Sequence, residues 1–301
     1  KDVLEIGREW RYDLFNLDIE LPEPIVSRPD RDEITERTSP DGTVITPISL
    51  SEVDGIADSL AASGIDSVGV CLLHAYQNPV HELAIRERLT KMLPDASVSL
   101  SSEVLPEINE YARTSTTVVN AYTKPLMERY LSSLEASLNK QGLRGRLLVM
   151  LSSGGVASVD TAANFPVRVI ESGPVGGAIM GQRIKEMAGI PVAFAFDMGG
   201  TTAKVCLLQG DEPARASEYE VARVHRFKVG SGIPLKVPCV DLLEIGAGGG
   251  SIADISPLGL LQVGPESAGA VPGPACYGQG GDRPTVTDAD LLLGYLNPEH
   301  F

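Results

Sequence analysis

One short run constrains what this chain can fold into more than any other part of it. The run is Phe194-Ala195-Phe196-Asp197-Met198-Gly199-Gly200-Thr201-Thr202-Ala203-Lys204-Val205. An apolar segment ends on a carboxylate, two glycines and two hydroxyls follow, and a second apolar segment resumes, which predicts a strand, a turn and another strand. Glycines let backbone N–H groups come close to an anion, and threonine hydroxyls add donors. The turn therefore suits a triphosphate, and Asp197 is placed to hold Mg²⁺ or its water shell.

The same turn has two alternative interpretations, a Walker-type loop and an ordinary hairpin. A Walker-type loop would run into a helix and end in Gly-Lys-Ser or Gly-Lys-Thr, and neither feature is present. An ordinary glycine-rich hairpin with an acid at its corner remains open as an alternative. The acid that precedes the glycines, Asp197, favours the phosphate-binding interpretation.

Composition limits the class of protein and the kind of partner. The chain has 301 residues, of which 43% are hydrophobic, so it can bury a sizeable core and form two domains or subdomains. Its 25 basic and 40 acidic residues give a net charge of -15, which argues against nucleic acid or an anionic membrane as the main partner. The four cysteines lack zinc-site spacing and are expected to be reduced.

Targeting signals also bear on where the protein works. No apolar stretch approaches the roughly 20 residues of a membrane span, and the first residues do not resemble a signal peptide. We therefore expect a cytoplasmic protein. Because the sequence does not begin with Met, we also expect it to start inside a longer chain.

The first third of the chain alternates helix and strand patterns. Ser49 and Glu52 predict a capping box at the start of a helix that Gly64 ends. A strand is predicted over 68–73, a helix from Asn78-Pro79, and a short strand over 98–100. Residues 50–101 are therefore expected to form one α/β layer, and the proline-rich residues 20–47 to form loops or edge strands.

The middle of the chain predicts a long helix and two places where strands deliver polar loops. The helical pattern starts at Glu103, and Pro125 should kink or split it. A fully buried strand over 147–151 leads into Ser152-Ser153-Gly154-Gly155, and a second extended run over 166–170 leads into Glu171-Ser172-Gly173-Pro174. The small-residue helix that follows, over 175–181, implies close approach of another backbone.

The last third is rich in loops. Its centre, Val240 to Ile252, is a second glycine cradle at Gly248-Gly249-Gly250, preceded by Asp241 and Glu244. Residues 264–278 are expected to form an ordered loop, and Thr287 with Asp290 to cap a final helix.

Several blocks together resemble the hydantoinase A/5-oxoprolinase family, which includes subunits of acetone and acetophenone carboxylases. The blocks that carry the resemblance are Tyr111-Ala112-Arg113-Thr114-Ser115-Thr116-Thr117, Asn120-Ala121-Tyr122, Ser153-Gly154-Gly155-Val156, Ser172-Gly173-Pro174, Phe196 to Thr201, Ile245 to Ile252, Pro272 to Tyr277 and Pro284 to Ala289. Residues 1–110 look similar to the end of that family's amino-terminal domain, and residues 111–301 to its core domain.

The resemblance implies an α/β fold of the actin-like or hexokinase-like ATPase kind, with ribonuclease-H-like halves that close over a nucleotide. The turn after Asp197 is similar to the second phosphate loop of that fold, whereas the first phosphate loop and the adenosine segment are absent from the chain. The chain therefore resembles a central fragment, incomplete at both ends. It also departs from the family where Thr201-Thr202-Ala203-Lys204 stands in place of Thr-Ser-Thr-Asp.

The chemistry implied by the resemblance is ATP-dependent hydrolysis of a cyclic amide, of the hydantoin or 5-oxoproline type, through phosphorylation of the carbonyl oxygen. The cofactors implied are ATP and Mg²⁺, with Asp197 as the metal ligand. Asp197, Lys204 and Asp241 are the candidate catalytic residues. The candidate nucleotide-binding residues are Gly199, Gly200, Thr201, Thr202, Gly248, Gly249 and Gly250. A solvated role remains the alternative for Lys204 and for the two acids of the second cradle.

Three functional hypotheses remain open. The family also contains ATP-dependent ketone carboxylases, and a non-catalytic or kinase-like protein could be built on the same fold. No residue separates the hydrolase from the carboxylase. The resemblance implies a partner subunit or domain of the hydantoinase B type, hence a hetero-oligomer, in which substrate choice would lie.

Overall fold

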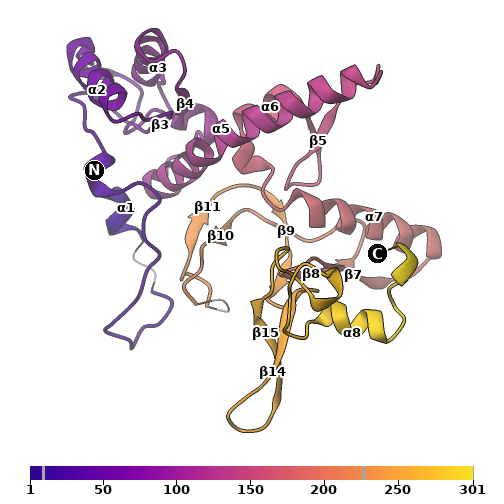
Figure 1. Cartoon of the computed structure of the whole chain (residues 1–301). Helices are drawn as coiled ribbons and strands as arrows, with labels where there is room; N and C mark the ends of the chain where they lie inside the picture. Colours follow the sequence, from indigo (N-terminus) through magenta and orange to yellow (C-terminus); the bar gives the residue numbers. More distant parts are fainter. Residues whose placement is uncertain (9–10, 226–227, 301) are drawn as a thin grey trace. The chain divides into compact units, whose positions relative to one another are not determined.

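The computed structural model describes residues 1–8, 11–225 and 228–300, which form two compact units (Figure 1). The first unit comprises Lys1–Ser172 and Ala216–Cys239, and the second comprises Gly173–Arg215 and Val240–Phe301. Short strands β9 (Arg215–Ala216) and β12 (Cys239–Val240) stand where the chain passes between them. The predicted domain division at residues 110 and 111 remains a prediction about family domains.

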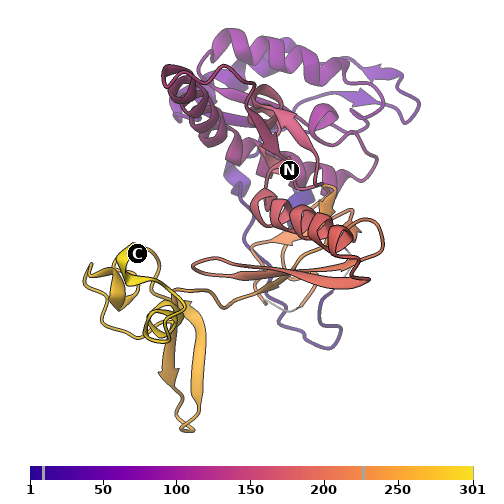
Figure 2. The same cartoon turned by 90° about the vertical axis from the view of Figure 1, so that its right-hand side faces the viewer.

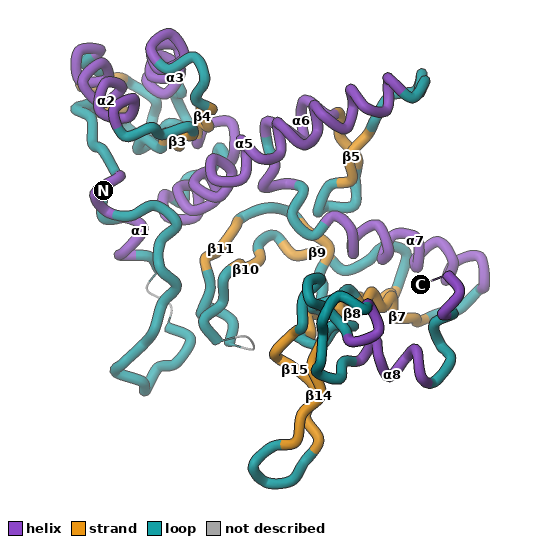
Figure 3. Tube along the Cα trace, in the orientation of Figure 1, coloured by secondary structure: helices purple, strands orange, loops and turns teal. Residues whose placement is uncertain are grey.

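The elements of the first unit alternate helix and strand over most of its length (Figure 3). Its helices are α1 (Val3–Ile6), η1 (Arg28–Asp30), α2 (Leu50–Ala62), α3 (Val80–Met92), α4 (Ser101–Val104), α5 (Glu110–Lys140), α6 (Val159–Asn164) and η2 (Pro166–Arg168). Its strands are β1 (Arg37–Thr38), β2 (Val44–Thr46), β3 (Ser67–Val70), β4 (Ser97–Leu100), β5 (Leu148–Met150), β6 (Val156–Ser158), β10 (Tyr219–Val221) and β11 (Ile233–Leu235).

The α/β layer predicted over residues 50–101 is present. Strands β3 and β4 pair in parallel, and apolar side chains of α2 and α3 form a buried core with them that includes Val53, Leu89 and Leu100. Side chains alternate along β3, so its other face meets α5. A Cβ on Gly69 would lie 3.6 Å from the Cβ of Ala121.

Helix α5 is the longest element and carries many buried polar side chains. It runs through Pro125 without being split (Figure 1). Arg113 is fully buried and donates to the carbonyls of Glu107 and Leu72, at 2.7 and 2.9 Å. The Arg113 guanidinium therefore caps carbonyl groups at a buried helix junction, which is a structural role.

The second unit is built on a three-stranded antiparallel sheet with one helix over it (Figure 2). Its strands are β7 (Val192–Met198), β8 (Ala203–Gln209), β13 (Leu243–Ile245), β14 (Ser251–Ile255) and β15 (Leu261–Ser267). Its helices are α7 (Ser172–Ala188), η3 (Ala275–Tyr277), α8 (Val286–Leu292) and η4 (Pro298–His300). Strands β7 and β8 are the predicted hairpin, and their ladder joins seven residue pairs.

Helix α7 packs on one face of this sheet through its small residues. A Cβ on Gly181 would lie 3.2 Å from Ala195 and 3.1 Å from Leu208, so this glycine has the predicted packing role. Added Cβ atoms on Gly176 and Gly177 would meet no atom of the described chain within 4 Å. Of Gly176, Gly177 and Gly181, close packing therefore accounts only for Gly181.

Several local predictions were wrong for identifiable reasons. Ser49 directly precedes α2, but no capping box forms, because Ser49 Oγ lies 2.9 Å from Ser51 Oγ and Glu52 accepts from the Thr35 N–H at 2.8 Å. Strand β5 is half exposed because it pairs only with β6 among the described strands. The run over 166–170 is a 3₁₀ turn rather than a strand, since Pro166 begins a helical turn.

The final helix begins earlier than predicted. Its capping box is formed by Thr285 and Asp288, not by Thr287 and Asp290. The Thr287 N–H donates to the Gly249 carbonyl at 2.8 Å. Thr287 therefore lies inside the helix, and its backbone is tied to the second glycine segment.

Candidate functional site

The connection between β7 and β8 is an exposed turn over residues 199–202. The Gly199 N–H closes it by donating to the Thr202 carbonyl at 2.9 Å. The N–H groups of Gly200, Thr201 and Thr202 donate to no residue within 1–8, 11–225 and 228–300. An added Cβ on Gly200 would meet nothing of the described chain within 4 Å. The turn thus presents three N–H donors and an open approach, which is the arrangement that an anion such as phosphate needs.

The second glycine segment packs directly on the back of this turn. Gly249 N–H donates to the Gly199 carbonyl at 2.9 Å, and Gly250 N–H donates to the Gly200 carbonyl at 2.7 Å. A Cβ on Gly248 would lie 2.6 Å from the backbone of Gly200 and Thr201. Two backbones approach here more closely than any residue with a side chain would allow.

This packing bears on the predicted nucleotide contacts of Gly248, Gly249 and Gly250. The Gly248 N–H donates to Ser251 Oγ at 2.8 Å, so all three N–H groups are engaged within the protein. Their contact with a ligand remains a prediction. What the structure shows is that they fix the position of the turn, which is a role that the sequence did not indicate.

A row of three charged residues crosses the sheet next to the turn. Asp197 on β7 pairs with Lys204 on β8, and Lys204 pairs with Glu244 on β13. Directly opposite residues project from the same face of a sheet, so the lysine lies between two carboxylates. Asp197 and Glu244 are exposed, and Lys204 is half-buried. Glu244, one of the two acids that the sequence places before the second glycine segment, is the charged residue of the otherwise apolar strand Leu243-Glu244-Ile245.

Two opposing influences act on the Lys204 ammonium. Burial lowers the pKa of Lys204, and the Glu244 carboxylate partly offsets that effect. Ala195 lies two residues from Asp197, and Leu208 lies four residues from Lys204, so both project from the same face of the sheet as the charged row. Both also lie next to Gly181 of α7, so the row lies on the face that α7 covers. A cation that is only partly hydrated and lies beside this exposed turn is suited to neutralising phosphate charge.

Asp241, the third candidate catalytic residue, lies away from the turn. It is two residues before β13, and its N–H donates to the Ala214 carbonyl at 2.8 Å. It is four residues from Ile245, which is the end of β13 nearest the turn, a separation of roughly 13 Å along an extended strand. The structure therefore brings Asp197 and Lys204 together with Glu244, and leaves Asp241 outside this group.

The described residues fit Mg²⁺ only in a form bound mainly by phosphate and water. No group of three or more His, Cys, Asp or Glu side chains in the described part of the chain could hold a metal ion. Mg²⁺ at phosphate sites commonly takes one or two carboxylates and completes its shell with water and phosphate oxygens. Exposed Asp197, two residues before the turn, suits that mode. No described helix is long and apolar enough to cross a bilayer.

Comparison with known proteins gives one consistent family. The family model described as hydantoinase/oxoprolinase matches residues 113–301, and the model of the hydantoinase/oxoprolinase N-terminal region matches residues 1–93. An uncharacterized protein of Methanocaldococcus jannaschii is 44% identical over 299 residues, which are 98% of this chain and 44% of that protein.

Two relatives with named activities, a caprolactamase and an acetone carboxylase, also have solved structures that match this chain. The caprolactamase subunit alpha of Pseudomonas jessenii is 36% identical over 98% of this chain and 42% of its own length. The crystal structure of that ATP-dependent caprolactamase matches with a TM-score of 0.70 at 35% identity. A nucleotide-free acetone carboxylase structure matches 89% of this chain and 37% of its own with a TM-score of 0.73 and 28% identity. The chain spans less than half the length of these relatives.

Proposed function

This chain belongs to the hydantoinase/oxoprolinase family, and we propose that it supplies one phosphate-binding half of an enzyme that hydrolyses a cyclic amide with ATP. The chain is α/β, and the finer assignment to an actin-like ATPase fold is part of this proposal. The named relative that carries the hydrolase hypothesis is the ATP-dependent caprolactamase, whose name specifies a lactam substrate. For this chain the substrate class is a hydantoin, a 5-oxoproline-like lactam or a related cyclic amide.

The observation that carries the proposal is the exposed turn over residues 199–202. Three uncommitted N–H groups, two hydroxyls and an open approach at Gly200 lie together, while the carbonyls of Gly199 and Gly200 are held from behind. An ordinary hairpin has no need of a second backbone fixed against its turn. Support from behind with donors left free in front favours a ligand site over a simple connection.

ATP supplies a phosphoryl group that converts an unreactive amide oxygen into a leaving group. The N–H groups of Gly200, Thr201 and Thr202 bind and orient phosphate oxygens. Lys204 neutralises negative charge near them, and Glu244 keeps that ammonium in position from the neighbouring strand. Asp197 would hold Mg²⁺, which would supply further neutralisation of the phosphate charge. Positioning and charge neutralisation are the contributions that phosphoryl transfer needs most.

The alternative function is that of an ATP-dependent ketone carboxylase subunit. The similarity to the acetone carboxylase structure favours it, and the residues described above would serve either reaction. In both cases we propose a partner subunit or domain of the hydantoinase B type. Location in the cytoplasm also remains a prediction.

Calorimetric titration with MgATP tests the proposal, on this chain and on a longer version of the protein. Gly200→Val should abolish binding while leaving the fold intact, because the added side chain meets no described atom but blocks the approach to the turn. Gly145→Val is the matched control, since Gly145 is exposed and its Cβ also meets nothing described. Unchanged affinity in Gly200→Val, or the same loss in Gly145→Val, would overturn the assignment of the turn.

A further inference from the structure

The first unit contains a cavity that the proposed phosphate site does not use. Its volume is about 620 Å³, within the range of small-molecule pockets. Helix α1, the segment that follows it, α5 and β11 provide its walls. Apolar side chains dominate these walls, among them Leu4, Ile19, Val118 and Ile233.

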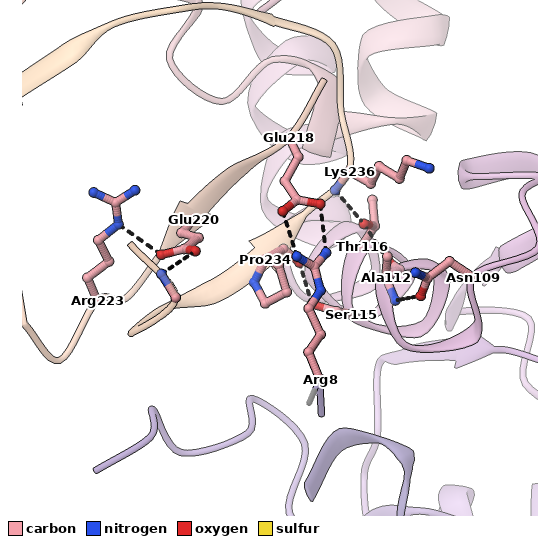
Figure 4. A network of polar contacts seen from close by, with 11 residues as sticks. Arg8, Asn109, Ala112, Ser115, Thr116, Glu218, Glu220, Arg223, Pro234 and Lys236 are labelled. Carbon is pink, nitrogen blue, oxygen red and sulfur yellow. Dashed lines mark hydrogen bonds and ion pairs between the residues drawn. The ribbon is translucent and has the colours of Figure 1, made fainter. Parts of the chain in front are cut away.

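The acidic groups at this cavity are already committed to partners. Glu220 accepts from the Gly230 N–H at 2.7 Å and from Arg223 Nε at 3.0 Å (Figure 4). Glu5 is hydrogen-bonded to Arg31. Both carboxylates are therefore hydrogen-bonded within the protein. After the hydrogen bond from Arg8 to Glu218 and the burial of Tyr111, the charge of Glu220 raises the pKa of Arg8 and of Tyr111 beside it further.

The two arginines that line the cavity, Arg8 and Arg11, differ in their partners. Arg8 forms a bidentate salt bridge with Glu218, in which Nη1 and Nη2 each donate to a carboxylate oxygen at 2.6 Å (Figure 4). The Glu218 carboxylate occupies the end of the guanidinium away from Nε, and Arg8 Nε is buried with no hydrogen-bond partner among the described residues. This nitrogen has less than 1 Å² of accessible surface, so a ligand in the cavity does not reach it.

Two more donors line the same cavity. Arg11 is exposed to it and makes no hydrogen bond or ion pair with any part of the chain that the structure describes. The Tyr111 hydroxyl belongs to a ring that lies 6.0 Å from the Arg8 guanidinium carbon, and burial raises the pKa of Tyr111 so that it remains a donor. One guanidinium is thus left without a counter-charge beside an apolar wall.

We propose that this cavity binds a small organic carboxylate with an apolar body. The carboxylate accepts from Arg11 and the Tyr111 hydroxyl, and the apolar body lies against the side chains of α1, α5 and β11. Arginine suits a planar carboxylate better than a point cation would. The inference is independent of the phosphate site, because all of its residues belong to the first unit.

Three probes with one six-carbon chain and different head groups test the proposal by calorimetry on the full chain. Hexanoate should bind most tightly, hexan-1-ol more weakly and hexylammonium most weakly, because only the first offers a charged acceptor. Equal binding of all three, tighter binding of hexylammonium, or no saturable binding of hexanoate would overturn the proposal.

Substitutions locate the binding in this cavity. Arg11→Met should weaken hexanoate binding about tenfold and leave hexan-1-ol binding unchanged, as expected for loss of one charge-assisted hydrogen bond. Tyr111→Phe removes only a hydroxyl and should weaken hexanoate binding by a smaller factor. Arg144→Met, at an exposed arginine outside the cavity, is the matched control. Full hexanoate affinity in both Arg11→Met and Tyr111→Phe would refute the assignment.

Discussion

Replacing Gly248 by alanine should loosen the turn over residues 199–202 without touching any ligand. The new Cβ would lie 2.6 Å from the backbone carbon and oxygen of Gly200 and from the backbone nitrogen of Thr201. Carbon atoms in contact are normally about 3.5–4.0 Å apart, so one backbone has to move by roughly 1 Å. Neither neighbour is a flexible side chain, and the movement cannot be absorbed locally.

The cost follows from two effects. Overpacking of a close contact costs about 1–3 kcal/mol. The shift also strains the hydrogen bonds that Gly249 and Gly250 donate to the turn, each worth about 0.5–1.5 kcal/mol. We therefore expect the free energy of unfolding of the second unit to fall by about 2–4 kcal/mol.

Urea denaturation measures the overall loss, and hydrogen exchange at the Gly249 and Gly250 amides locates it. Gly200→Ala is the matched control, since it adds the same methyl group on the other side of the contact where no described atom lies within 4 Å. Gly248→Ala should lose amide protection and Gly200→Ala should keep it. Wild-type protection and stability in Gly248→Ala would refute the idea that backbone contact holds the turn.

Three further perturbations address individual charges. Asp197→Ala should lower MgATP-dependent turnover of the complete enzyme by a factor on the order of 10² or more with the fold intact, and undiminished turnover would contradict the metal assignment. Glu244→Gln should lower the pKa of Lys204 further, because the carboxylate now opposes the effect of burial; an NMR titration that finds the same or a higher pKa would contradict the charge row. Burial raises the pKa of Asp288, but hydrogen bonds from Cys276 and Thr285 outweigh it and hold the pKa at about 2. The stability that Asp288 contributes should be complete above its usual pKa of 3.8 and disappear as pH falls toward 2, so the difference in urea midpoint between wild type and Asp288→Asn should shrink over that window; a constant difference would show that the carboxylate charge is not involved.

Elements whose pattern is local were predictable from the sequence. The β7–β8 hairpin follows from two apolar runs that flank a glycine pair, and the register puts Asp197 opposite Lys204 once the turn is located. Helix α3 and strand β4 likewise lie where the patterns predicted. In each case the determining residues are neighbours in the sequence.

Features that depend on distant partners were not predictable. A glycine that admits a phosphate and a glycine that admits another backbone meet the same requirement, the absence of a Cβ, so Gly248-Gly249-Gly250 could be interpreted either way. The role in backbone packing became visible only through the contact with Gly199 and Gly200, which lie about fifty residues earlier in the sequence. The exposure of β5 was missed for the same reason, because burial of a strand depends on which strands and helices cover it.

The backbone contact also gives Gly248 a way to influence affinity that does not depend on its own contact with a ligand. An exposed four-residue turn would ordinarily sample several conformations, and a ligand would have to order it at a cost in conformational entropy. Here the Gly199 and Gly200 carbonyls are fixed by Gly249 and Gly250, so the peptide planes that carry the N–H groups of Gly200 and Thr201 are oriented before a ligand arrives. The conformational entropy of the turn is therefore lost when the protein folds, and not when the ligand binds. Affinity for phosphate should therefore follow the integrity of this contact, even though the N–H groups of the second glycine segment are all directed within the protein.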